Sequence, residues 1–190
     1  TIDTGASGAA QNESIAFAQN GDFFVGNTNG NQHILRYNSA GVLQQQYTVA
    51  TENAGSDWIE LASDQHTIFY TSEGSHIKRY DTATGTQLSD FATITDTSGT
   101  AFALRLLPPG DGSHGLLVAD SDNIKRLDAN GNVTQTYNYA GASQWFGLNL
   151  DPNGTSFWSG SSGTRPFFRF NIDPSGRDKG PISGSNVTMS

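Results

Sequence analysis

The feature that most constrains the fold of this chain is a short phrase that occurs four times. The phrase consists of a basic residue, an aromatic residue or leucine, and Asn or Asp, in that order. A glycine follows within a few positions. The arginines that open it are Arg36, Arg79, Arg126 and Arg169, at steps of 43, 47 and 43 residues. A period of this length is typical of one four-stranded β-propeller blade.

Each repeat divides in the same way into four short apolar or alternating segments separated by turn signals. Pairs such as Asn20-Gly21 suit tight hairpins because both residues tolerate a positive φ. No window has the periodicity of a helix, and a β-sandwich would share the turn spacing without the regular repeat. The sequence therefore predicts an all-β propeller with four antiparallel, four-stranded blades. We place these blades at about residues 13–50, 57–95, 101–140 and 145–184 of one domain spanning 1–190.

Equivalent positions in the repeats predict the core, and the two ends of the chain raise the question of closure. The residues expected to be buried between blades are Phe17, Leu61, Leu104 and Leu148, with Ile34, Ile77, Ile124 and Phe168 beside them. The chain begins at Thr1, and the fourth strand of the last blade is expected at 180–183. Residues 1–3 could close a four-bladed ring against that strand, the chain could be part of a larger propeller, or two copies could join edge to edge.

Two stretches carry a resemblance to known propeller families. Residues 116–132 have the sequence Leu-Leu-Val-Ala-Asp-Ser-Asp-Asn-Ile-Lys-Arg-Leu-Asp-Ala-Asn-Gly-Asn. This stretch resembles an NHL-type blade. Residues 13–17, 20–22 and 34–37 are similar to the senescence-marker and gluconolactonase branch of six-bladed propellers. The resemblance implies a metal-binding acid before the first strand of a blade, a place that Glu13 matches, and a metal-dependent lactonase activity.

The composition excludes several classes of partner. The formal net charge is −8 and only 15% of the residues are charged, so a basic surface for nucleic acid or anionic lipid is absent. The apolar runs are too short to span a bilayer. There is no cysteine, and lysine is confined to Lys78, Lys125 and Lys179, while small neutral polar residues abundantly replace charge. We therefore expect a secreted, cell-surface or periplasmic protein.

In a propeller the loops that enter the first strand and those that join the second to the third open on one face. The residues of these loops that we predict to bind a ligand are Glu13, Asp57, Trp58, Glu73, His76, Gln144 and Trp145. The tryptophans could stack on sugars, although equivalent aromatic residues in a repeat more often pack between blades. The four arginines of the repeat are expected to be structural and to pair with acids of neighbouring blades.

A metal site and a catalytic base are the two catalytic hypotheses that the sequence offers. Glu13, Asp120, Asp122 and Asn123, with Asp57 or Glu60, would give the oxygen ligands that Ca²⁺ or Mg²⁺ prefers. Alternatively, Asp120 and Asn123 cap their own loop through bonds to the backbone. A lyase would need His76 as a base, with an acid partner such as Glu73.

These observations favour a non-catalytic extracellular propeller that binds a protein or carbohydrate, or that builds a surface assembly. Self-association through exposed blade edges is a further expected interaction. The alternative is a metal-dependent enzyme of the lactonase or lyase type. Ca²⁺ and Mg²⁺ are the only cofactors that the sequence suggests, and no nucleic acid partner or membrane insertion is expected.

Overall fold

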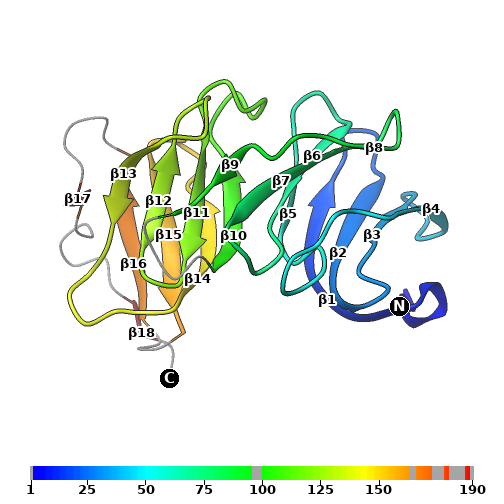
Figure 1. Ribbon diagram of the computed structural model, residues 1–190, viewed down its shortest axis with the longest axis horizontal. Helices are drawn as coiled ribbons and strands as arrows, with labels where there is room; N and C mark the ends of the chain where they lie inside the picture. The colour runs from blue at the N-terminus through cyan, green and yellow to red at the C-terminus, as the bar shows by residue number, and fades with distance from the viewer. Residues whose placement is uncertain (1, 96–99, 163–165, 173–177, 180–186, 189–190) are drawn as a thin grey trace. The chain divides into compact units, whose positions relative to one another are not determined.

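The chain is all-β and consists of four propeller blades, which confirms the predicted fold class (Figure 1). The computed structural model describes residues 2–95, 100–162, 166–172, 178–179 and 187–188. Among these residues the only helix is one 3₁₀ turn, Gly5–Ser7, and no helix there is long and apolar enough to cross a membrane. The chain divides into two compact units, Thr1–Thr93 and Ile94–Ser190, with two blades each.

The first unit contains two antiparallel sheets whose strands follow one another in chain order. The first blade consists of β1 (Ala9–Phe17), β2 (Phe23–Gly30), β3 (Ile34–Tyr37) and β4 (Leu43–Tyr47). The second blade consists of β5 (Ile59–Leu61), β6 (Thr67–Tyr70), β7 (His76–Asp81) and two short strands, β8 (Thr86–Gln87) and β9 (Ala92–Thr93), which both pair with β7. The repeated arginine lies in the third strand of each blade.

The second unit repeats this arrangement. Its strands are β10 (Ala101–Leu106), β11 (Leu116–Asp120), β12 (Ile124–Leu127) and β13 (Val133–Tyr137), then β14 (Trp145–Leu150), β15 (Ser156–Ser161) and β16 (Pro166–Asn171). Two short strands complete it: β17 (Asp178–Lys179) pairs in parallel with β13, and β18 (Val187–Thr188) pairs with β16. The strand predicted at 180–183, and with it the pairing of residues 1–3, lies outside the described residues.

One hairpin depends on a glycine for both conformation and space. Gly115, just before β11, has a φ of +76°, which residues with a side chain rarely adopt. A Cβ at this position would lie 1.8 Å from the carbonyl oxygen of Leu127, far inside contact distance. The close approach of these two chain segments therefore requires glycine.

The core between the first two blades is made by facing side chains of β2–β4 and β5–β7. It contains Phe24, Ile34, Tyr47, Val49, Ile59, Ile68, Tyr70 and Tyr80. Most of the predicted core positions are confirmed as buried, namely Ile34, Ile77, Leu104, Ile124, Leu148 and Phe168. Burying such side chains is the main stabilising term of the fold.

The prediction for Phe17 is wrong, and Leu61 is only half-buried. The end of β1 pairs regularly with β2, with Ala16 opposite Phe24 and Phe17 opposite Phe23, so the two residues face opposite sides of the sheet. Ala16 packs on the core between the blades, whereas Phe17 lies on the opposite face, where it touches Phe23 and remains 69% exposed. The described part of the first unit has no further blade that covers this face, so the cluster there stays within one sheet.

Candidate functional site

Three predicted site residues, Glu13, Asp57 and Glu73, come together in the first unit. Asp57 lies just before β5, and its backbone N–H donates to the carbonyl oxygen of Thr71 at 3.0 Å. Its own carbonyl oxygen accepts from the hydroxyl of Ser14 in β1 at 2.7 Å. These bonds fix the start of the second blade beside Glu13 of the first blade, and the Asp57 side chain is fully buried.

The carboxyl of Asp57 holds a proton at neutral pH. Burial raises its pKa to about 8, and the hydrogen bond and charge of Glu13, followed by the charge of Glu73, act in the same direction. Among the described residues no donor reaches either carboxyl oxygen of Asp57. A protonated carboxyl needs no such donor, because it can donate to Glu13 instead. The pair of acids thus binds a proton more tightly than an isolated aspartate would.

The third acid of this group, Glu73, lies on a conformationally unusual backbone. Its φ of +49° is in the left-handed region, which is uncommon for residues other than glycine. Burial raises its pKa, and the charge of Glu13 adds to this effect. Glu73 therefore contributes to a concentration of acidic groups at the entrance of the second blade.

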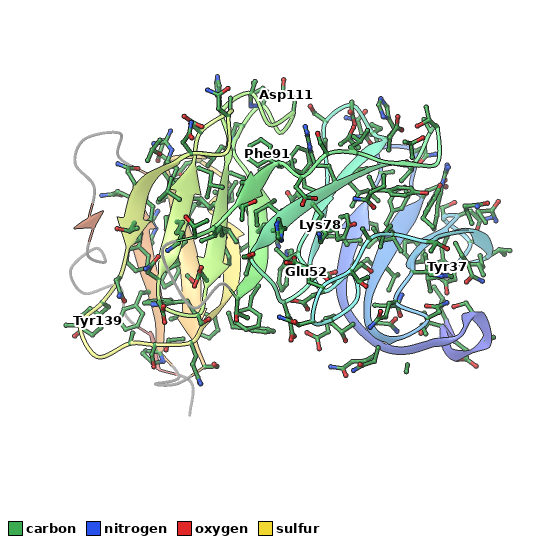
Figure 2. All side chains as sticks on the ribbon, in the orientation of Figure 1. Tyr37, Glu52, Lys78, Phe91, Asp111 and Tyr139 are labelled. Atoms are coloured by element: carbon green, nitrogen blue, oxygen red, sulfur yellow. The ribbon has the colours of Figure 1, made fainter. Side chains whose placement is uncertain are left out.

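His76 has an acid partner, as the lyase hypothesis requires, but this partner is Glu52 and not Glu73, the residue given as the example. Its Nδ1 lies 2.6 Å from a carboxylate oxygen of Glu52, and the backbone N–H of Ser75 donates to the same oxygen at 3.1 Å. The ammonium of Lys78 lies 3.9 Å from the other oxygen of Glu52, and Figure 2 labels these two side chains. The imidazole is therefore held by a local ion-pair network that Glu52 organises.

The predicted aromatic and amide residues lie in two different units. Trp58 is half-buried in the first unit. Gln144 and Trp145 belong to the second unit, where the exposed Gln144 anchors its backbone N–H on Ser121 at 2.7 Å. Trp145 is fully buried, its ring N–H donates to Asn138 at 3.1 Å, and its ring packs on aromatic residues of β16. Trp145 thus has the role of a packing residue.

Asp120, Asp122 and Asn123 form a compact turn between β11 and β12. The backbone N–H groups of Asp120 and Asn123 donate to each other's carbonyl oxygens at 2.8 and 3.1 Å, and the N–H of Asp122 donates to the Asp120 carboxylate at 3.3 Å. The ammonium of the buried Lys125 donates to the side-chain oxygen of Asn123 at 2.7 Å. These bonds correspond to the loop-capping alternative that the sequence offered. The cation beside the turn is the ammonium of Lys125.

Two polar hollows, which we call the Arg–Gln hollows, open elsewhere on the surface. The first, of about 680 Å³, is lined by Arg36, Gln44, Gln45, Gln46, Tyr47, Thr48, Tyr80, Thr82, Ala83, Thr84 and Gly85. The second, of about 430 Å³, is lined by Ser113, His114, Arg126, Asp128, Ala129, Asn130, Thr134 and Gln135. Both hollows are open to solvent and lined largely by polar groups.

The two hollows share the repeat positions of an arginine and a glutamine, although Gln45 is exposed and Gln135 is buried. Arg36 pairs across the strands with Gln45 in the first blade, and Arg126 pairs with Gln135 in the third. In the third blade the arginine donates to the glutamine oxygen at 3.3 Å. The remaining walls differ, since the first hollow uses the turn after β7 and the second uses loops of its own blade. A common Arg–Gln pair is therefore the element that recurs.

The expectation that the repeated arginines pair with acids of neighbouring blades is wrong. The guanidinium of Arg36 binds Asp22 of its own blade, and Arg169 binds Asp151 of its own blade, both at 2.6 Å. A hairpin places each acid beside the third strand of the same sheet, which is closer than any residue of the next blade. Sequence reasoning also missed the hollows, although a glutamine nine positions after the arginine in two repeats was a visible signal.

In comparisons with known proteins, no family model and no curated protein matches this chain. Within the part of the chain that the structure describes, no three His, Asp or Glu side chains form a group that could hold a metal ion. The described residues thus offer two candidate sites. One is the group of Glu13, Asp57 and Glu73, and the other is the pair of Arg–Gln hollows.

Proposed function

We propose that this chain is a non-catalytic extracellular β-propeller module that binds a protein or glycan ligand. The observation that carries the proposal is the recurrence of the Arg–Gln hollow in the first and third blades. A binding module gains from repeating a site, because each copy can add avidity. Catalysis instead needs one set of converging reactive groups.

The composition supports the extracellular part of the proposal. Lysine is restricted to three positions, cysteine is absent, and small neutral polar residues make up much of the surface loops. The net charge of −8 keeps such a module soluble and disfavours adsorption to nucleic acid or anionic lipid. A neutral, hydrogen-bonding surface then selects its ligand by geometry more than by charge.

An array that carries purified glycans and extracellular proteins tests this function with the labelled chain. We expect binding that falls in the double variant Gln45→Ala/Asn130→Ala, which trims one lining amide from each hollow. The control is Gln19→Ala, an exposed glutamine outside both hollows. Binding to no component, or binding that the double variant leaves unchanged, would contradict the proposal.

The second candidate is a metal-dependent enzyme of the lactonase or lyase type, which the Glu13–Asp57 pair favours. Carboxylate oxygens suit Ca²⁺ and Mg²⁺. The fit is poor at neutral pH, however, because Asp57 holds a proton that a cation would have to displace. Lactone hydrolysis that requires Ca²⁺ or Mg²⁺, and that Glu13→Gln abolishes, would establish the enzyme instead of the binding module.

A further inference from the structure

We propose that the two Arg–Gln hollows bind neutral saccharides through hydrogen bonds to sugar hydroxyls. This inference rests on the proposed binding function and names the ligand class for it.

The charge of each hollow is close to balanced. In the first hollow the Nε and Nη2 atoms of Arg36 both donate to one carboxylate oxygen of Asp22, at 3.0 and 2.6 Å. In the second hollow Arg126 and Asp128 line the same space. In the second hollow an acidic saccharide would meet the Asp128 carboxylate, and in the first the only charged lining residue, Arg36, is already paired with Asp22. A neutral saccharide would meet oriented donors and acceptors in both hollows.

The lining groups match the chemistry of sugar hydroxyls. Three consecutive glutamines of β4, Gln44, Gln45 and Gln46, are exposed in the first hollow, and Thr48 and Thr84 add hydroxyls. An amide both donates and accepts, as does each hydroxyl of a sugar. Neighbouring sugar hydroxyls can therefore each find a partner without leaving a buried polar group unpaired.

A protein ligand is less well matched to these hollows. Protein interfaces draw most of their affinity from large side chains that fill desolvated, mainly apolar pockets. The aromatic residues of the first hollow, Tyr47 and Tyr80, are buried in its floor, and the exposed lining is polar and uncharged apart from Arg36. A small polar ligand gains more from this surface than a protruding hydrophobic side chain would.

The floor of the first hollow is rigid, which limits the entropy cost of binding. The rings of Tyr47 and Tyr80 lie 5.6 Å apart within the core shared by the two blades. The guanidinium of Arg36 is fixed by Asp22 and lies over the ring of Phe24, 5.9 Å from its centre. Groups that are already held in place lose little freedom when a ligand arrives.

The test is isothermal titration of the full chain with maltotriose, cellotriose, mannotriose and galactotriose, beside trigalacturonic acid as the acidic probe. We expect at least one neutral trisaccharide to bind at two sites per chain. Gln45→Ala and Asn130→Ala should each weaken one site about tenfold, as expected when one or two hydrogen bonds are lost. Gln19→Ala should leave both sites unchanged, and far-UV circular dichroism should show that every variant is folded.

Binding of the acidic probe alone, binding of no saccharide, or binding that neither hollow variant weakens would overturn the inference. The proposed function fails in a different way. If an arrayed protein binds and Gln45→Ala weakens it while no saccharide binds, the hollows are binding sites and only the ligand class is wrong. If no arrayed component depends on the hollows and metal-dependent lactone turnover appears, the binding function itself is wrong.

Discussion

Replacing Asp57 with asparagine is expected to stabilise the protein at neutral pH. The folded-state pKa of about 8 lies above the ordinary value of 3.8, so the folded state holds the proton more tightly than the unfolded state. The free energy of unfolding must then fall as the pH rises from about 4 to about 8, and level off above that. At pH 7 the free energy of unfolding is lower than near pH 4 by at most about 4 kcal/mol, since each unit of pKa shift corresponds to about 1.4 kcal/mol.

Asparagine removes the titration but keeps the shape and the ability to donate to Glu13. Urea unfolding at pH 5, 6, 7 and 8, followed by far-UV circular dichroism, should show Asp57→Asn more stable by about 2 to 4 kcal/mol at pH 7. Its advantage over the unsubstituted chain should grow with pH and then level off. Asp3→Asn, which removes an exposed carboxylate, should show no such trend.

An Asp57→Asn variant that is less stable at pH 7, or whose difference from the parent chain is the same at every pH, would refute this reasoning. Either result would mean that Asp57 is ionised in the folded protein. Its charge would then have to be compensated by a bound cation, and the metal-dependent alternative would gain support.

Four further substitutions test the fold, each by urea unfolding. Leu104→Ala should lower the free energy of unfolding by about 2–5 kcal/mol, whereas Phe17→Ala, at an exposed position, should lower it by less than about 1 kcal/mol. Gly115→Ala should be strongly destabilising, because its φ is positive and a carbonyl oxygen occupies the space of the Cβ. Asp151→Asn should be destabilising at pH 7 and nearly neutral near pH 2, since a hydrogen bond from Ser156 lowers the Asp151 pKa, and this stabilisation is lost on acidification.

The repeated arginine phrase was sufficient to predict the blades because it marks the same strand each time. Each arginine lies in the third strand of its sheet, and a turn lies at the following glycine in the first three repeats. The hairpin signals on both sides define the other strands. Such local signals do not determine which face of a strand is buried. In β1 Ala16 pairs with the core residue Phe24 and faces inward, and Phe17 faces outward, although the reverse is the more hydrophobic choice.

The acids of the candidate site were predictable individually, but their chemistry was not. Asp57 precedes β5 and Glu73 joins β6 to β7, as their positions in the repeat predicted, whereas Glu13 lies within β1 and not in a loop before it. The raised pKa of Asp57 depends on complete burial, which no sequence pattern encodes. Burial was also unpredictable for Trp58 and Trp145. They occupy equivalent positions in their repeats, but Trp58 is half-buried and Trp145 is fully buried.

The Arg–Gln hollows could be predicted only in part. Gln45 and Gln135 both follow the repeated arginine by nine positions, whereas Leu88 and Asp178 occupy this place in the other repeats. The second wall of the first hollow comes from the turn after β7, which belongs to the next blade. The position of this turn depends on how the two blades of the first unit pack. It is therefore determined by the core and not by a local motif.

The central claim is that both Arg–Gln hollows are binding sites for one neutral ligand, and NMR of the side-chain amides tests it most directly. Methyl glycosides of glucose, galactose and mannose would be added one at a time to the ¹⁵N-labelled chain. We predict that the amide signals of Gln45 and Gln135 shift together with at least one glycoside, while that of Gln19 stays in place. Shifts confined to residues around Glu13, Asp57 and Glu73, with both hollow amides unchanged, would contradict the account.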